Sequence, residues 1–437
     1  MTPELSPLAI SGLGMLGMFG LILLHVPLGV AMGVAGVVGF ALLVDWSPSF
    51  AMLANETASA LTSMDLATIP LFILMGGFAG AAGLSEDLYR MVQALVGHRR
   101  GGLSVATIGG CAGFGAVCGS SIATTATFGK VALPSMLMRG YAPGFATGTI
   151  AAGGTLGVLV PPSVIMVIYA VLAEQLIVTL YVAAIVPALL AVALHVVAIA
   201  VATSVRPDLA PAGERLPWSD RLREVRRGWA VLLMIGLVLG GIAFGIFTAT
   251  EGAAVGAALA FGFALARGGL DRRTMMAAMT ETATTTAMIY LIIIGATVFG
   301  YFVTVSRAPQ ELVEAIGASG WPVPVLMALL MLMYIVLGAV FDELAAMVIT
   351  MPFVLPMVLS WGFDPVWWGI VMVVVIEIGL LTPPLGMNVF VIHAMAPGVP
   401  LTRIYAGVTP YIASNLLRLT LLLAFPALAL WLPAALR

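Results

Sequence analysis

LGVLVPPS (156–163) and IGLLTPPL (378–385) are the two stretches that decide the fold. Each lies inside a long apolar run, and each interrupts that run with two adjacent prolines. Proline removes a backbone donor and leaves a carbonyl about one turn earlier without its partner. In lipid, an interrupted helix is tolerated only where it lines a cavity or is buried in protein. The two stretches therefore predict two broken helices around an internal site.

The sequence around these breaks repeats at a constant distance. FGKVALPSM (128–136) aligns without a gap with TMPFVLPMV (350–358), so that Pro134 falls on Pro356, 222 positions later. Gly157 falls on Gly379 at the same spacing, and the two Pro-Pro pairs also coincide. Agreement of several prolines and a glycine at one offset predicts an internal repeat, each copy having a hairpin followed by a broken helix.

Composition places the chain in a membrane. Of its 437 residues, 61% are apolar and 9% are charged, whereas soluble domains contain roughly 25% charged residues. Because so few charges cannot cover a surface that faces water, the surroundings are predicted to be a lipid bilayer. The net charge of −2 does not indicate the basic surface that binding of a nucleic acid requires. We therefore expect an all-α polytopic membrane protein.

The repeat divides the chain into three parts. Residues 1–202 are predicted to form the first copy, with a re-entrant hairpin at about 103–138 and a broken helix at about 143–172. Residues 203–228 are polar and are predicted to be a cytoplasmic loop. Residues 229–437 form the second copy, with a hairpin at about 322–359 and a broken helix at about 365–396. Each hairpin arm is shorter than the roughly 20 residues that a span requires.

The placement of basic residues predicts the orientation. If the N-terminus is outside and each hairpin returns to its own side, fourteen arginines lie in the cytoplasm and two, Arg307 and Arg437, lie outside. Short cytoplasmic loops are the ones that accumulate Lys and Arg. In this arrangement the first hairpin enters from inside and the second from outside. Such an inverted repeat is a common signature of secondary transporters.

Polar residues at the hairpin turns are the candidate ligands. The first turn contains Gly119, Ser120 and Ser121, and its hydroxyl oxygens are hard ligands suited to Na⁺; the alternative is that they only pack against neighbouring helices. The second turn contains Asp342 and Glu343, two adjacent acids in an apolar run, which by default indicate a functional site. Asp342 has three possible roles, which are capping the next helix, binding a cation and carrying a proton.

The two breaks supply further polar groups. Freed carbonyls there can coordinate a dehydrated cation, and helix N-termini can hold a carboxylate. At the second break, Thr382 and Asn388 offer oxygen ligands, and Gly386 permits a close approach of the backbone. Glu377 lies about one turn before that break, as either a protonatable coupling group or a buried acid bonded to a neighbouring helix. Lys130 either extends to the interface, meets a substrate carboxylate or pairs with an acid.

Four longer stretches carry a family resemblance. They are GSSIATTATFGKVALPSM (119–136), GGTLGVLVPPSVIMVIYA (153–170), FDELAAMVITMPFVLPM (341–357) and EIGLLTPPLGMNVFV (377–391). They closely resemble the repeats of the large membrane subunit of tripartite ATP-independent periplasmic (TRAP) transporters of the DctM type, in the same order along nearly the whole chain. Lys130 departs from the family pattern, in which a small or apolar residue is expected.

The resemblance implies an elevator-type transporter, in which a domain of two hairpins and two broken helices moves against a fixed scaffold. It implies coupling to Na⁺, no other cofactor, and uptake of a small organic acid across the bacterial inner membrane. It also implies two partners, a soluble periplasmic substrate-binding protein and a small four-helix membrane subunit, here expected as a separate chain.

Carried over to this sequence, the resemblance and the residue types together give two sets of candidates. The Na⁺ candidates are Gly119, Ser120, Ser121, Gly154, Thr155, Pro161, Asp342, Thr382, Pro383 and Gly386. The substrate candidates are Ser121, Thr124, Ser163, Asp342, Glu343 and Asn388.

Other classes of function are less well supported. A stand-alone Na⁺- or H⁺-coupled organic-anion symporter is the main alternative, and it needs no soluble partner. A channel is a third class, but no segment repeats as a filter loop. Because the sequence contains no recognisable catalytic constellation, an enzyme is not expected.

Overall fold

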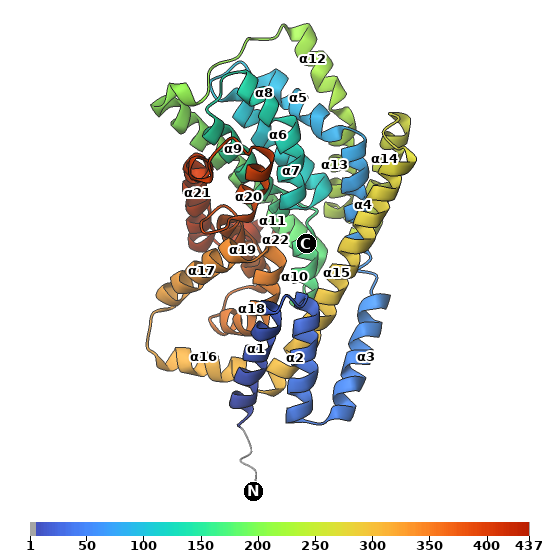
Figure 1. Cartoon of the computed structure of the whole chain (residues 1–437), viewed down its shortest axis with the longest axis vertical. Helices are drawn as coiled ribbons and strands as arrows, with labels where there is room; N and C mark the ends of the chain where they lie inside the picture. The colour runs from blue at the N-terminus through green and yellow to red at the C-terminus, as the bar shows by residue number, and fades with distance from the viewer. Residues whose placement is uncertain (1–5, 437) are drawn as a thin grey trace.

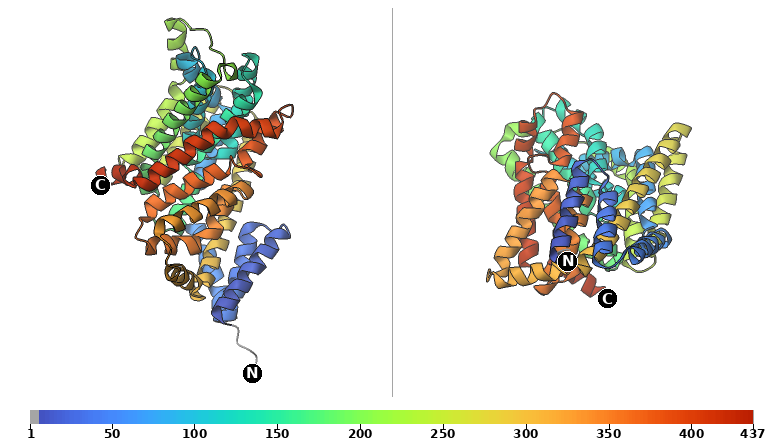
Figure 2. Two further views of the ribbon diagram at one scale, coloured as in Figure 1. Left: turned by 90° about the vertical axis from the view of Figure 1, so that its left-hand side faces the viewer. Right: turned by 60° about the horizontal axis from the view of Figure 1, so that its bottom comes forward.

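The computed structural model describes residues 6–436, and in that part of the chain every regular element is helical. Six helices are long and apolar enough to cross a membrane, or up to nine if each bent pair is counted as one span. The expected all-helical polytopic membrane fold is therefore confirmed. Helices α1 and α2 lie beside α15 and α16, at the end of the molecule opposite α12 (Figures 1 and 2).

The first five helices precede the first hairpin. They are α1 (Pro7–Leu23), α2 (Leu28–Leu43), α3 (Trp46–Thr62), α4 (Thr68–Ala81) and α5 (Leu84–Val96). The long apolar run at the N-terminus is divided at His25, whose φ of 63° lies in the left-handed region. Helix α3 was not predicted, because Asn55, Glu56 and several Ser and Thr residues interrupt its apolar pattern.

The first hairpin and first broken helix follow directly. The hairpin consists of α6 (Gly102–Cys118), α7 (Ser121–Val131) and α8 (Leu133–Met138), and the broken helix consists of α9 (Pro143–Leu159) and α10 (Val164–Leu172). The two halves of the broken helix are bent by 41°. A long helix, α11 (Ile177–Val205), completes this half of the chain.

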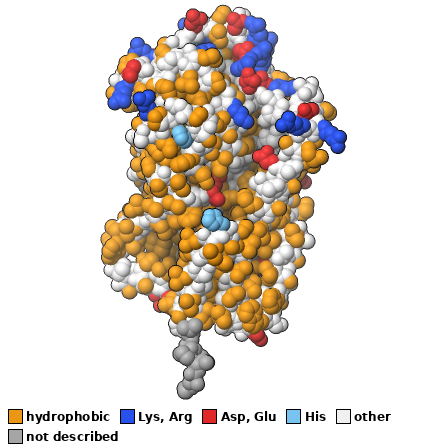
Figure 3. All heavy atoms as spheres, viewed as in Figure 1, with side chains coloured by type: hydrophobic (Ala, Val, Ile, Leu, Met, Phe, Trp, Pro, Cys, Tyr) orange, Lys and Arg blue, Asp and Glu red, His pale blue; other side chains and the backbone are white. Residues whose placement is uncertain are grey.

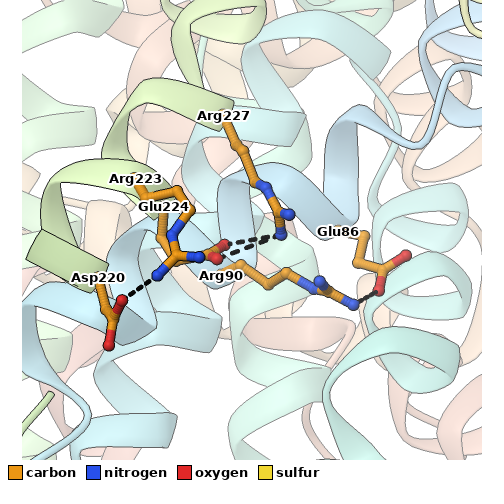
Figure 4. A network of polar contacts seen from close by, with 6 residues as sticks. All are labelled: Glu86, Arg90, Asp220, Arg223, Glu224 and Arg227. Atoms are coloured by element: carbon orange, nitrogen blue, oxygen red, sulfur yellow. Dashed lines mark hydrogen bonds and ion pairs between the residues drawn. The ribbon is translucent and has the colours of Figure 1, made fainter.

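The segment predicted as a cytoplasmic loop at 203–228 is more ordered than a loop. It contains a short 3-10 turn, η1 (Pro207–Leu209), and helix α12 (Trp218–Arg227), which contacts α5. Both helices carry ion pairs on their surfaces. Arg227 Nη1 lies 3.2 Å from Glu224 Oε1 on α12, and Arg90 Nη2 lies 2.5 Å from Glu86 Oε1 on α5 (Figure 4). Helix α12 was not predicted, because its sequence is mostly charged and polar and has no long apolar run.

The second half has the same order of elements. Before its hairpin come α13 (Trp229–Ala243), α14 (Ala249–Ala266), α15 (Arg272–Val305) and α16 (Ala308–Ala318). The hairpin is α17 (Val323–Val340) with α18 (Glu343–Ser360), and the broken helix is α19 (Pro365–Gly379) with α20 (Met387–Met395). Helices α21 (Leu401–Ala424) and α22 (Ala427–Ala435) end the described chain. The short helix α16 was not predicted.

Small residues let the outer helices pack closely. A Cβ atom on Gly36 of α2 would lie 2.8 Å from the backbone nitrogen of Phe299 on α15, so only glycine fits there. On the face shown in Figure 3, Lys and Arg side chains gather toward the α12 end of the molecule, and apolar side chains dominate the opposite half, with a few Asp and Glu side chains among them (Figures 1 and 3). This distribution agrees with a protein whose middle lies in lipid.

Candidate functional site

The tip of the first hairpin rests on the first break. Gly119 ends α6 with a φ of 67°, a conformation that glycine adopts without strain. A Cβ atom at Gly119 would lie 2.9 Å from the carbonyl oxygen of Pro162, so a side chain would separate the two. Ser120 then caps α7 by accepting a hydrogen bond from the Ala123 amide at 3.4 Å.

The first broken helix packs tightly against the same hairpin. A Cβ atom on Gly157 would lie 2.6 Å from Thr124 Oγ1 and 2.7 Å from the carbonyl oxygen of Ser120. Gly154, one turn earlier on α9, faces the hydroxyl of Thr125. The glycines of α9 therefore bring the hydroxyl groups of α7 against the backbone of the broken helix.

Several hydroxyl groups at this contact lack a partner. The side-chain oxygens of Thr124, Thr125 and Ser163 are buried and accept or donate no hydrogen bond within the described residues. By contrast, Thr155 donates to the carbonyl of Ala152 at 2.9 Å. A buried hydroxyl without a partner costs about 1–3 kcal/mol. Such oxygens fit a hard cation, because Na⁺ would satisfy them.

The second hairpin ends in the two acids. Asp342 caps α18, since its carboxylate accepts a hydrogen bond from the Ala345 amide at 2.8 Å. The structure thus shows the capping role of Asp342, while cation binding and proton transfer by the same side chain stay predictions. Asp342 is exposed, and Glu343, the first residue of α18, is half-buried.

The second break lies against its own hairpin. The amides of Leu385 and Gly386 donate to the carbonyl of Ala339 at 3.3 and 3.2 Å. Thr382 donates to the carbonyl of Ile378 at 2.6 Å within its own helix. Pro383 is exposed, whereas Pro161 at the first break is buried. The two breaks therefore differ in how deeply their prolines are buried in the protein.

The two hairpins meet each other and the second break at one point. Ser121 Oγ donates to Glu343 Oε2 at 2.9 Å and lies 3.3 Å from Asn388 Oδ1. The Asn388 amide donates to the carbonyl of Ala151 on α9 at 3.3 Å. Ser121 and Glu343 are 222 positions apart, the same spacing as the repeat, so they occupy equivalent positions in the two copies. Three substrate candidates from three segments are thus brought together.

The packing between the repeats is crossed. Helix α7 of the first hairpin contacts α20 of the second broken helix, and α18 of the second hairpin contacts α10 of the first. Gly129 on α7 faces Met395 and Ile392 of α20. Each hairpin therefore touches a half-helix of the other copy, which places both tips near the centre of the molecule.

The remaining candidates do not join this contact directly. The hydroxyls of Thr155 and Thr382 bond within their own helices. Lys130 is exposed and takes part in no ion pair recorded between described residues. Their proposed ligand roles, like those of the other candidates, stay predictions.

Sequence reasoning missed a buried ion pair beside the site. Glu377 pairs with Arg418 of α21, and both side chains are no more than 1% exposed. Of the two alternatives for Glu377, this contact favours the acid bonded to a neighbouring helix. The spacing of Tyr411, Ser414 and Arg418 on one face of α21 is the signal that indicates a buried polar stripe.

The buried stripe on α21 continues away from the ion pair. Ser414 lies 2.9 Å from His195 Nδ1 of α11, and the Tyr411 hydroxyl lies 2.7 Å from the Thr149 hydroxyl of α9. No group of three or more His, Cys, Asp or Glu residues suited to a metal ion occurs in residues 6–436. The polar atoms of the hairpin contact are hydroxyl, amide and carboxylate oxygens instead.

Two opposed hairpins that meet two broken helices inside an all-helical membrane protein define a secondary transporter fold. The family model of the tripartite ATP-independent periplasmic transporter, DctM component, matches residues 15–428, and the chain belongs to this family. The resemblance drawn from the four sequence stretches is therefore confirmed.

Individual relatives agree with the family. A C4-dicarboxylate TRAP transporter large permease protein from Pseudomonas aeruginosa is 35% identical over 88% of this chain and 89% of its own. An isethionate TRAP transporter permease from Oleidesulfovibrio alaskensis is 33% identical over 95% of this chain and 65% of its own. The crystal structure of the Alcanivorax borkumensis YdaH transporter has a similar fold, with a TM-score of 0.57 and 17% identity over 88% of this chain and 89% of its own.

Proposed function

We propose that this chain is the large permease subunit of a binding-protein-dependent secondary transporter that uses a Na⁺ gradient to take up a small organic acid. The observation that carries the proposal is the contact of Ser121 with Glu343 and Asn388, where both hairpins meet the second break. A substrate held there would touch both repeats at once. The chemistry of the relatives named for C4-dicarboxylates and isethionate supports an organic acid.

The coupling ion would lie at the first hairpin and first break. The unpartnered hydroxyls of Thr124, Thr125 and Ser163 are the groups that support this placement. Oxygen ligands suit a hard cation, and freed backbone carbonyls add to them. A second ion would lie near Asp342 and the Thr382–Gly386 segment of the second break.

The proposed movement is an elevator in which the hairpins and broken helices travel together against α1–α4 and α13–α16. The proposed membrane is the bacterial inner membrane. The proposed partners are a small four-helix membrane subunit, as a separate chain, and a periplasmic binding protein. The family membership supports a partnership of this kind, and so does the isethionate relative, which is named permease protein DctMQ and is longer than this chain.

Reconstitution tests the proposal. The purified membrane complex in liposomes, with the binding protein outside, should accumulate substrate when an inward Na⁺ gradient is imposed. Equal uptake when K⁺ replaces Na⁺ would contradict the coupling. Transport by this chain without any binding protein would instead support the stand-alone symporter.

A further inference from the structure

The hairpin contact is acidic and lacks a basic partner. Glu343 Oε2 accepts a hydrogen bond from Ser121, and no residue in the described part of the chain donates to the other carboxylate oxygen. Within residues 6–436, neither Glu343 nor Asp342 forms an ion pair. One carboxylate oxygen of Glu343 is therefore available where the substrate is proposed to bind.

The nearby basic side chains serve elsewhere. Arg418 pairs with Glu377 through Nη2 within the buried stripe of α21; its Nε and Nη1 have no partner in the described part of the chain, and no ion pair joins it to Glu343. Lys130 follows Ser121 by nine residues on α7, which places it about 14 Å away along the helix axis. On the face shown in Figure 3, the Lys and Arg side chains gather toward the α12 end of the molecule. No side-chain cation at the hairpin contact is therefore in place to neutralise Glu343.

The remaining groups at the contact are neutral. Ser121 supplies a hydroxyl, and Asn388 supplies an amide that already donates to Ala151 at 3.3 Å. Helices α7, α18 and α20 begin at this point, and helix N-termini carry a partial positive charge. These groups suit one substrate carboxylate. A substrate that bears only negative charge would in addition face the Glu343 carboxylate, and like charges at short range repel each other.

From this imbalance we propose that the transported organic acid also carries a cationic nitrogen, so that its net charge is close to zero. The nitrogen would pair with the available oxygen of Glu343, and the carboxylate would lie against Asn388 and the helix N-termini. Charge-assisted hydrogen bonds of this type are stronger than neutral ones. The inference rests on the proposed function and narrows its substrate class to zwitterions such as betaines, cyclic amidines and amino acids.

A binding experiment on the purified membrane complex tests the proposed substrate class. The soluble binding protein is left out, so that its own selectivity does not affect the result. Thermal unfolding would be followed in NaCl with equal concentrations of zwitterions (ectoine, glycine betaine, proline, taurine) and of anions without a cationic nitrogen (succinate, isethionate, lactate). We expect at least one zwitterion to raise the unfolding temperature and the anions to leave it unchanged. The inference is overturned if an anion stabilises more than every zwitterion, or if no zwitterion stabilises.

Variants then locate the recognition at Glu343. Glu343→Gln should weaken the apparent affinity for the best zwitterion by about tenfold or more, because it removes the charge that pairs with the nitrogen. Glu343→Asp should retain part of that affinity. Glu314→Gln, at an exposed acid on α16, is the matched control and should bind like the parent. If Glu343→Gln leaves the zwitterion preference intact and shifts only the Na⁺ requirement, Glu343 binds the coupling ion and the inference is wrong.

The same data separate this inference from the proposed function. Zwitterion binding that needs no Na⁺ would contradict the sodium coupling and leave the substrate class standing. Na⁺-dependent binding of succinate in preference to the zwitterions would support the coupling and reject the substrate class.

Discussion

At the scale of single residues, the substrate contact that we propose depends on a few side chains at the hairpin contact. Ser121 is the only described side chain that donates a hydrogen bond to Glu343. Hydrogen bonds to charged groups contribute about 1.5–3 kcal/mol. If the same energy is lost from the transport cycle, the Ser121→Ala variant should transport roughly ten- to hundred-fold more slowly. Uptake rates in proteoliposomes would measure this, and Ser204→Ala, at an exposed serine of α11, should transport at the parent rate. A Ser121→Ala variant with full activity would remove Ser121 from the site.

The buried pair of Glu377 and Arg418 is a second residue-scale feature with a measurable consequence. Removing one partner leaves an uncompensated charge in a low-dielectric interior, which costs about 3–5 kcal/mol. Glu377→Gln and Arg418→Gln should each lower the thermal unfolding temperature strongly, and the double variant should recover part of the loss. The exposed pair of Glu86 and Arg90 provides the control, since Glu86→Gln should change stability very little. Equal losses of stability at the two pairs would contradict the larger contribution that we expect from the buried pair.

At the scale of elements, the packing of the first hairpin against α9 depends on the absence of a side chain at Gly157. An alanine there would place a carbon 2.7 Å from the carbonyl oxygen of Ser120, so the hairpin tip must move. We expect Gly157→Ala to reach the membrane in normal amounts and to lose most transport activity. Gly300→Ala is the matched control, because nothing lies within 4 Å of the added carbon on α15. Normal uptake by Gly157→Ala would show that the tip position is not critical.

The elements also show what a sequence can predict in a membrane protein. Prolines, left-handed glycines and long apolar runs mark the hairpins and broken helices, because breaks in lipid need specific residues. Helices α3 and α16 have mixed polar sequences, so hydropathy alone does not reveal them. The repeat spacing of 222 positions shows that Ser121 and Glu343 are equivalent residues of the two copies. It does not show that they touch, because that contact depends on the crossed packing of the two copies. The Glu377–Arg418 contact likewise joins helices whose neighbourhood no periodicity predicts.

At the scale of the whole molecule, the unequal distribution of charge predicts the direction of insertion. Of the sixteen arginines that the predicted topology places in loops, fourteen fall on the cytoplasmic side, and Arg307 is the only outside one among described residues, since Arg437 lies beyond them. The α12 end of the molecule, where the basic side chains gather, should therefore face the cytoplasm (Figure 3).

Labelling of single cysteines tests that orientation. In a background with Cys111→Ala and Cys118→Ala, the Ser319→Cys variant should react with a membrane-impermeant maleimide on intact cells, because Ser319 is exposed between α16 and α17. The Ser219→Cys variant, on α12, should react only after the membrane is opened. One added or missing span would reverse the orientation of every segment that follows it. The opposite labelling pattern would therefore mean that the first hairpin enters from outside and the second from inside.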